Sequence, residues 1–536
     1  MPYIKMVHIK GYKRFSDATF NFNEDKTILV GDNESGKSTI LEAIDLAMNR
    51  TSHDFDLSLL PILFNAKNVE SFKASPSSKT LPSIIIQIFF GGMNGDPKFF
   101  EFQGANWEEN NKGTVDFGIE LKINLDSSLF EKLGVQIRKG DIPCEYYQTT
   151  VMTFAGTAYY PAMSPISFCL IDATSGDAPT LSSYSRVIFE RLLPPEKQIE
   201  LKNTFSEKLS AAMEDTMKAL PTNSPRFQAD IAKTSLERIV SIYEDSLPLV
   251  SKGKGRESLI KTKMMIDARK EASVIGIEEP ENHLSPEGMR EMIALIQEEN
   301  EGRQLILTSH SSKIVSGVGL KDVVLLSKDS QDSMALSKLD HETSNYFRCL
   351  PNDNLLYFVL AKKVILVEGP SETLYLEKFY EKMFPGHTFD KDKITVIPVN
   401  GLAFERFVSV AGVLKKRLAL ITDNDANPHK KSDLDTGFHA IYNDTSSFQI
   451  FMENDTAKRT FEVCLFEANE DLISSKLKLI DGAEYKNDYA KDNRYLGKML
   501  NEKTGTALTL SQDPDFVTRV SIPAYLSDAL NFIHND

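Results

Sequence analysis

A glycine-rich segment between a strand and a helix is the feature that most constrains how this chain folds. The segment GDNESGKS, from Gly31 to Ser38, follows the apolar stretch KTILV and precedes STILEAIDLAM, whose apolar residues recur every three or four positions. It fits the pattern GxxxxGK[ST], which requires this strand–loop–helix setting. The glycines let backbone N–H groups close on phosphate oxygens, Lys37 is expected to reach the terminal phosphates, and the Ser38 hydroxyl is expected to hold Mg²⁺. The sequence therefore predicts an α/β domain that binds ATP with Mg²⁺.

Length, charge and cysteine content restrict the class of protein further. A chain of 536 residues is too long for one core, so we expect two to four domains. Its apolar runs are strand-sized, none reaches the ~20 residues of a membrane span, and the first residues lack a secretory apolar region. The four cysteines form no CxxC pair, which is typical of a reducing cytoplasm and argues against a zinc site. The net charge of −15 does not suggest a passive nucleic-acid coat, but it is compatible with an enzyme that acts on DNA.

Two acidic residues end a second apolar strand in the segment VIGIEEPENHLSP. Glu278 is expected to orient the magnesium ion, and Glu279 is expected to polarise the attacking water. The next strand ends in LILTSH, where His310 would reach the γ-phosphate or its water. A lone histidine is more often structural, but its place one strand after the two acids favours a functional role.

In their order along the chain these segments resemble the ABC-type ATPases of the SMC/RecF branch. GDNESGKS resembles their Walker A motif, IGIEEPE their Walker B motif, ENHLSP their D-loop and TSH their H-loop. The Walker B acid here is glutamate where aspartate is commoner, and a carboxylate suffices for the role. The nucleotide-binding residues that the resemblance implies in these motifs are Asn33, Gly36, Lys37, Ser38, Thr39 and Glu278.

The family's signature sequence resembles the segment LVSKGKGRES, although the usual LSGG is absent. By this match Ser251, Gly253 and Gly255 would face the nucleotide of a second copy of the chain; a surface loop with two glycines is the alternative. Because the chain has one phosphate loop, the resemblance implies a homodimer or a larger homo-oligomer built from dimers. Gln87 and Gln148 are both candidates for the glutamine of the Q-loop.

A helical segment at 183–250 interrupts the α/β pattern. Its apolar residues Leu201, Phe205, Leu209 and Met213 recur every four positions. This stripe is expected to pack either on its own domain or on a second subunit, which makes the segment a candidate dimerisation domain. The domains that we expect are 1–182 (first part of the ATPase), 183–252 (helical insertion), 253–345 (second part of the ATPase) and 346–536 (a second α/β domain).

Carboxylates also follow apolar strands in the second α/β domain. VILVEGPSE places Glu368 after a strand, LALITDND places Asp423 and Asp425, and KRTFE supplies Glu462. Because open α/β sheets bind ligands at the carboxyl ends of their strands, these side chains are expected to converge at one edge. Such clusters select Mg²⁺ or Mn²⁺ and would repel one another without a cation. A flavodoxin-like sheet with incidental acids is the alternative.

The glutamate in VEG followed by DxD on a later strand resembles the Toprim domain. An ABC-type ATPase that precedes a Toprim domain, joined by a segment like LLYFVLAKKVILVEGPSETLYL, resembles the OLD family of ATPase–nucleases over nearly the whole chain. The metal ligands that this resemblance implies are Glu368, Glu372, Asp423, Asp425 and Glu462, for two Mg²⁺ or Mn²⁺ ions. The family also has a late basic residue that contacts the scissile phosphate. The candidates for this role are Lys486, Lys491, Arg494 and Lys498, of which we favour Lys491; an ordinary charged helix face is the alternative.

The resemblance implies an ATP-regulated DNA endonuclease that uses two metal ions. It also suggests a cytoplasmic effector of defence against phage, which works alone, beside a helicase-like protein, or with a retron reverse transcriptase and its RNA–DNA product. One rival is a primase or topoisomerase, for which the chain lacks the usual zinc module and the room for a strand-passage domain. The other is a nucleic-acid-binding ATPase or sensor with an inactive nuclease, against which the intact acids argue.

Overall fold

The chain forms two compact units in the computed structural model, and each is described by itself. The first unit contains Met1–Val318 and Asp322–Met334, and the second contains Gly319–Lys321 and Ala335–Asp536. The structure describes all residues except 52–54, 94, 109, 111, 127, 129–140, 173–192, 218–241, 245, 269–270, 299–301, 329–330, 332, 350–353, 400–402, 443, 445, 480–492 and 536. Within these limits, every helix is too short or too polar to cross a membrane.

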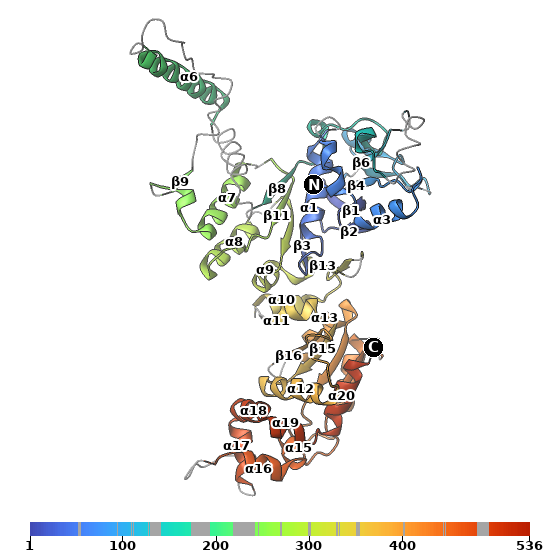
Figure 1. Ribbon diagram of the computed structural model, residues 1–536, viewed down its shortest axis with the longest axis vertical. Helices are drawn as coiled ribbons and strands as arrows, with labels where there is room; N and C mark the ends of the chain where they lie inside the picture. Colours follow the sequence, from blue (N-terminus) through green and yellow to red (C-terminus); the bar gives the residue numbers. More distant parts are fainter. Residues whose placement is uncertain are drawn as a thin grey trace. The chain divides into compact units, whose positions relative to one another are not determined.

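A parallel sheet forms the centre of the first unit (Figure 1). Its strands lie in the order β13 (Val323–Leu326), β3 (Lys26–Gly31), β12 (Gln304–Ser309), β11 (Val274–Glu278) and β8 (Phe168–Asp172), with the short β14 (Ser333–Ala335) beyond β13. All six residues of β12 are buried, as are five of the six in β3. Strands buried on both faces are continuous apolar runs, which explains why KTILV and LILTS form this sheet.

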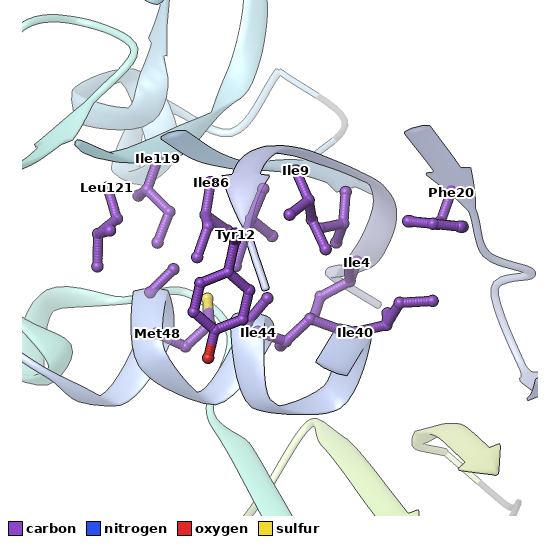
Figure 2. Packing of buried hydrophobic residues seen from close by; sticks show 14 of the residues in the cluster. Ile4, Ile9, Tyr12, Phe20, Ile40, Ile44, Met48, Ile86, Ile119 and Leu121 are labelled. Atoms are coloured by element: carbon purple, nitrogen blue, oxygen red, sulfur yellow. The ribbon is translucent and has the colours of Figure 1, made fainter. Parts of the chain in front are cut away.

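An antiparallel sheet covers the helix that follows the phosphate loop. This sheet contains β2 (Phe15–Asn21), β1 (Tyr3–Tyr12), β4 (Ile84–Gly91), β6 (Asp116–Leu125) and β5 (Gln103–Gly104), with β7 (Tyr147–Thr153) also paired to β6. Figure 2 shows Ile40, Ile44 and Met48 of α1 (Lys37–Asn49) pointing toward Ile86 and Ile119 of the antiparallel sheet. The opposite side of α1 contacts the parallel strands, so this helix fixes the phosphate loop between two layers.

Other helices of the first unit lie beside its motifs or between α1 and β4. Beside the motifs are α7 (Lys254–Ala268), α8 (Pro286–Glu298) and α9 (Ser312–Val318), and between α1 and β4 are α2 (Leu60–Leu63) and α3 (Ala66–Ala74). α8 packs on both α7 and α9.

The helical insertion is described only in part. α6 (Pro195–Met217) is a helix of 23 residues, whereas 183–192 and 218–241 lie outside the described residues. On α6 the side chain of Leu201 is 43% exposed, and Phe205, Leu209 and Met213 are only partly buried. The chain therefore leaves the apolar stripe of α6 incompletely covered.

A smaller parallel sheet organises the second unit. Its strands lie in the order β16 (Ile394–Pro398), β15 (Lys363–Val367), β17 (Arg417–Ile421) and β18 (Phe448–Phe451). The chain passes from β15 outward to β16, and then returns to the other side of β15 to form β17 and β18. The strand order thus reverses between β15 and β17, and such a switch point is where open α/β sheets bind ligands.

Helices surround this sheet and extend its core toward the C-terminus. α12 (Pro370–Met383) and α20 (Ala524–His534) pack on the strands (Figure 1). The same core includes residues of the five short helices α15 (Phe461–Glu467), α16 (Glu470–Lys476), α17 (Arg494–Asn501), α18 (Lys503–Ser511) and α19 (Pro514–Arg519). A second group of helices comprises α10 (His341–Cys349), α11 (Asn354–Leu360), α13 (Phe404–Leu414) and α14 (Lys430–Ile441). The expected α/β class, with an ATPase domain followed by a parallel-sheet domain, is confirmed.

The packing of α1 between two sheets predicts how the first unit responds to mutation. Ile44 is fully buried, so Ile44→Ala leaves a cavity and should lower the free energy of unfolding by about 2–5 kcal/mol. Trp107, the only tryptophan of the sequence, packs on Phe154 in this unit, so its fluorescence during urea denaturation reports the unfolding. Ile62→Ala, at a side chain that is 72% exposed, is the control and should change stability by less than about 0.5 kcal/mol. Equal effects of the two variants would contradict this packing.

Candidate functional site

The phosphate loop joins β3 to α1 through a left-handed glycine. Gly36 has φ 96°, and a Cβ placed there would lie 2.4 Å from the ring of Phe15. Only glycine meets both conditions without strain. The next residue, Lys37, donates hydrogen bonds from Nζ to the carbonyl oxygens of Gly31 (2.9 Å) and Asp32 (3.2 Å). These two hydrogen bonds hold the lysine ammonium against the backbone of the loop.

A pocket of about 340 Å³ opens over this loop. The residues that line it are Lys13, Arg14, Asn33, Glu34, Gly36, Lys37, Ser38, Thr39 and Glu279. Sequence analysis did not single out Lys13 and Arg14, because they lie in the turn between β1 and β2, far from the motif along the chain. Together with Lys37 they give the pocket three cations, which suits a polyphosphate ligand. Neither Gln87 nor Gln148 is among the lining residues.

Glu278 ends β11 and forms a hydrogen bond with the Ser38 hydroxyl. Burial raises the pKa of Glu278, the Ser38 bond opposes this, and the nearby Asp172 and Glu42 raise it further. The two groups that sequence analysis assigned to magnesium therefore meet in the structure. A partly buried carboxylate with a raised pKa next to a hydroxyl is a donor set that fits Mg²⁺.

Glu279 and His310 meet beyond the ends of β11 and β12. Glu279 has φ 41°, and its backbone N–H donates to Thr308 Oγ1 (3.0 Å). His310 Nδ1 lies 3.7 Å from Glu279 Oε1 and 3.4 Å from Glu281 Oε1. The strand order thus brings together the acid and the histidine that sequence analysis placed at the γ-phosphate.

Glu281 is a buried acid that sequence analysis missed. Its Oε1 accepts hydrogen bonds from Ser309 Oγ and from the His310 backbone N–H, both at 2.7 Å. These bonds fix the turn that carries His310. A glutamate in a loop of the sequence gives no sign of burial, so only its proximity to His310 in the fold identifies it.

The signature-like segment lies away from the phosphate-loop pocket of its own chain. Ser251 Oγ donates to the Pro248 carbonyl (2.7 Å), and α7 begins just after Gly253. Gly253 and Gly255 line a second pocket of about 400 Å³ with His283 and neighbouring residues. Here a Cβ at Gly255 would lie 2.2 Å from the His283 carbonyl oxygen, so the segment and the loop after Glu279 are packed backbone to backbone.

The acids of the second unit meet where its strand order reverses. Glu368 follows β15 and Asp423 follows β17, and the Asp423 backbone N–H donates to Glu368 Oε1 (3.0 Å). Asp423 Oδ1 in turn accepts from the Phe461 backbone N–H (2.8 Å), which places Glu462 beside it. Asp425, with φ 49°, turns outward and is 64% exposed at its side chain. Of the four acids expected to converge here, the structure brings together Glu368, Asp423 and Glu462, whereas Asp425 is mostly exposed.

Burial and mutual repulsion raise the pKa of two of the acids in this cluster, Asp423 and Glu372. Burial, then the charges of Glu368 and Glu462, raise the pKa of Asp423 to about 8. Burial is also the main reason that the pKa of Glu372 rises to about 7, with the charge of Glu462 adding to it. Glu462 is 1% exposed, and its Oε1 has no hydrogen-bond partner in the described part of the chain. An orphaned carboxylate oxygen among repelling acids fits a hard divalent cation.

Two lysines that sequence analysis missed lie against these acids. Lys503, the first residue of α18, donates to Glu462 Oε2 (2.9 Å). Burial lowers the pKa of Lys503, but the charges of Glu462, Asp423 and Glu372 outweigh it and the net shift is upward. Lys430 donates to Asp425 Oδ2 (2.6 Å), and its Nζ lies 3.7 Å from Glu368 Oε1.

The favoured basic residue, Lys491, lies outside the described residues, as does Lys486. Among the other candidates of that stretch, Lys498 donates to the Lys478 carbonyl (2.8 Å) and Arg494 begins α17. Lys503, which follows that stretch in sequence, lies against the acids instead.

In the comparison with known proteins, one family model matches the first unit and another matches part of the second unit. The model of the AAA ATPase domain family matches residues 3–151 and 175–315, more than half of the chain. The model of the TOPRIM domain of overcoming-lysogenization-defect-like proteins matches residues 359–425. The Old nuclease of Escherichia phage P2 is 25% identical over 168 residues, 28% of either chain.

The chain belongs to the OLD family. Its AAA ATPase match contains the phosphate loop, Glu278 and Glu279, and its TOPRIM match contains Glu368, Glu372, Asp423 and Asp425. The OLD-family resemblance predicted from the motifs is therefore confirmed.

Other similarities to this OLD-family chain are shorter or more distant. The RecF DNA replication and repair protein of Crocosphaera subtropica is 39% identical over 61 residues, 11% of this chain and 16% of that protein. These matches span less than a third of the length of the curated relatives. Among solved structures, the C-terminal region of the Burkholderia pseudomallei OLD protein aligns with 33% of this chain and 98% of that one, at 23% identity and a TM-score of 0.26. The family assignment rests on the sequence matches.

The raised pKa values of the acids predict that metal binding in the second unit releases protons. Because the pKa of Asp423 is about 8 and that of Glu372 about 7, Asp423 is mostly protonated and Glu372 about half protonated at pH 7, and a cation displaces these protons. The affinity for Mn²⁺ should therefore rise as the pH rises from about 6 to 8, by up to about tenfold per unit for each proton released. Calorimetric titration with Mn²⁺ in buffers of different ionisation enthalpy measures the number of protons.

Asp423→Asn removes one of these titrating groups and should release fewer protons than the native chain. The control is Asp435→Asn on α14, at a partly exposed acid away from the cluster, which should leave proton release unchanged. Affinity that does not change between pH 6 and 8 would show that the acids bind no metal.

Proposed function

We propose that this chain is an ATP-regulated, metal-dependent DNA endonuclease. The observation that carries the proposal is the convergence of Glu368, Asp423 and Glu462 at the switch point of the second sheet, with the Lys503 ammonium beside them. The raised pKa values of Asp423 and Glu372, the orphaned oxygen of Glu462 and an adjacent ammonium suit a site that handles metal ions and phosphate together. The family match to the Old nuclease supports phosphodiester hydrolysis as the reaction.

The proposed roles at the nuclease site follow from these contacts. The metal ligands are Glu368, Glu372, Asp423, Asp425 and Glu462. Mg²⁺ or Mn²⁺ held there would supply an activated water and stabilise the leaving oxygen. Lys503 is close to the acids but 43% exposed at its side chain, so its ammonium is available to a phosphate from the solvent side. Lys430 neutralises Asp425 and Glu368 and orients both.

The proposed roles at the ATPase site use the first unit alone. Lys37 and the backbone of the loop hold the phosphates, and Ser38 with Glu278 would hold Mg²⁺. Glu279 acts as the base that orients water, and His310, fixed by Glu281, lies beside it for the γ-phosphate. Asn33, Gly36 and Thr39 complete the cradle.

A second copy of the chain is part of this proposal. Ser251, Gly253 and Gly255 lie outside the phosphate-loop pocket, so they would complete the nucleotide site of a partner subunit. The incompletely covered stripe on α6 suits packing between copies, in a dimer or a larger homo-oligomer. We further propose a cytoplasmic role in defence against phage, alone, with a helicase-like protein, or with a retron reverse transcriptase and its RNA–DNA product.

A nucleic-acid-binding ATPase or sensor without nuclease activity is the second candidate. The similarity of this chain to RecF proteins of DNA replication and repair favours it. The two candidates differ in whether the acids of the second unit cleave DNA.

Cleavage of supercoiled plasmid DNA separates these functions. With Mg²⁺ or Mn²⁺ the native chain should nick or linearise the plasmid, and Asp423→Ala should lower the rate by at least about 10³-fold because it removes a central ligand. The same variant should hydrolyse ATP at the native rate, since Asp423 lies in the other unit. Lys37→Ala should abolish ATP hydrolysis, and its cleavage rate with and without ATP gives the sign of the coupling.

ATP hydrolysis that persists while neither the native chain nor Asp423→Ala cleaves any plasmid would favour the second candidate. Unchanged cleavage by Asp423→Ala would instead place the nuclease site elsewhere.

The position of Lys503 predicts a distinct kinetic defect. Lys503→Ala should lower kcat for cleavage by about 10²–10³-fold, because the variant loses a cation beside the developing phosphate charge. Lys503→Arg should restore part of this rate. Lys498→Ala, on the neighbouring helix α17, is the matched control and should cleave normally. If Lys503→Ala cleaves like the native chain, the lysine only neutralises Glu462.

A further inference from the structure

A cluster of two histidines and one aspartate lies in the second unit apart from the acids described above. His387 and Asp392 come from the segment between α12 and β16, and His534 is the last residue of α20. Each side chain presents a ligand atom within 4.8 Å of the others. Metal-ligating residues from segments far apart in sequence therefore meet at one point.

The cluster lies at the amino end of the parallel sheet. The His534 carbonyl accepts a hydrogen bond from Lys363, the first residue of β15, and Asp392 comes just before β16. Glu368 follows the opposite end of β15, whose five residues span about 16 Å. The cluster is thus separated from the proposed nuclease site by the length of the sheet.

The hydrogen bonds of Tyr380 determine which ring nitrogen of neutral His534 carries the proton. The Tyr380 hydroxyl donates its single proton to Asp392 Oδ2 (2.7 Å), and the same oxygen lies 2.7 Å from His534 Nδ1. His534 Nδ1–H must therefore be the donor to Tyr380, which leaves a lone pair on Nε2. Phe384 stacks on the imidazole ring at 3.8 Å and 9°, so the ring is also held in orientation.

His387 is held in a similar way by Asp392. Its Nδ1 lies 3.0 and 3.1 Å from the two carboxylate oxygens, and its ring is 5.0 Å from that of His534. The Nδ1 nitrogen and the carboxylate thus already lie near the separation of roughly 3.3 Å that two ligands of one tetrahedral ion have, and a metal ion would replace the proton between them. Two oriented imidazoles and a carboxylate are the donors that Zn²⁺ takes in proteins.

We propose that His387, Asp392 and His534 bind a divalent transition metal of the Zn²⁺ class, which fastens the end of α20 to the segment before β16. Tetrahedral bonds of about 2.0 Å place ligand atoms roughly 3.3 Å apart, so the three groups approach one another by side-chain rotation. His387 is 48% exposed and free to make this movement. The cluster uses no cysteine, which is why the cysteine pattern of the sequence gave no sign of it.

The donor set also separates this site from the acids at the other sheet edge. Nitrogen ligands favour Zn²⁺ and Co²⁺, whereas all-oxygen sites favour Mg²⁺ and Mn²⁺ in octahedral geometry. The metal here would therefore stabilise the fold of the second unit and take no part in phosphodiester cleavage.

Cobalt absorption of the full chain tests the proposal. Metal-free protein titrated with Co²⁺ should develop the intense visible absorption of a tetrahedral nitrogen-containing site, at one Co²⁺ per chain, and Zn²⁺ should displace it. Octahedral binding at the carboxylates absorbs only weakly, so the two sites are distinguishable. His387→Ala and Asp392→Ala should each lose this absorption, and the exposed His341→Ala is the control that should keep it.

Thermal unfolding provides the second measurement. Zn²⁺ at about 100 times its Kd should raise the Tm of the second unit by about 5–10 °C in the native chain and in His341→Ala. The same addition should give no more than a small rise in His387→Ala, a variant at a half-exposed side chain that leaves the Phe384–His534 stacking intact. Absence of tetrahedral absorption in the native chain, or equal absorption in His387→Ala, would overturn the proposal and leave the cluster as a hydrogen-bonded tie.

Discussion

Burial of several carboxylates at one place is the constraint on which the second unit depends. Asp423, Glu372 and Glu462 are buried beside one another, and each negative charge raises the cost of the next. Hydrogen bonds and cations offset this repulsion, and among the described residues the cations are Lys503 and Lys430. The repulsion that remains is the reason that we propose a metal site here, because a hydrated divalent ion is the species best able to bind several carboxylates at once.

Charged groups are also buried together in the first unit, but there a cation is buried and neighbouring acids stabilise it. There the cation is Lys37, held at the mouth of the phosphate loop, and burial lowers the pKa of its ammonium. Glu279, Glu281 and Glu278 partly offset that effect and keep the charge where phosphates would bind. Both sites lie at the carboxyl ends of buried parallel strands, where side chains from several strands can meet without exposing the backbone.

Much of both sites could be predicted because their residues directly follow apolar strands. Glu278, Glu368 and Asp423 each come at or just after a short apolar run, and every such run is a strand of a parallel sheet. Lys503 could not be found in this way. It lies 41 residues from Glu462 on a helix with many charged neighbours in sequence, and nothing local distinguishes its ammonium from theirs.

The sequence by itself determined which segments become strands, where the phosphate loop lies and which acids end strands, because these depend on local backbone geometry and apolar spacing. Only the tertiary structure decided which strand ends lie next to one another. β15 pairs with β17 as well as with β16, the next strand along the chain, so Glu368 meets Asp423 across a crossover. It likewise decided that Glu281 is buried under His310 and that His387 meets His534. Long-range packing sets these contacts, since it selects strand order and helix docking among arrangements that the local sequence allows equally.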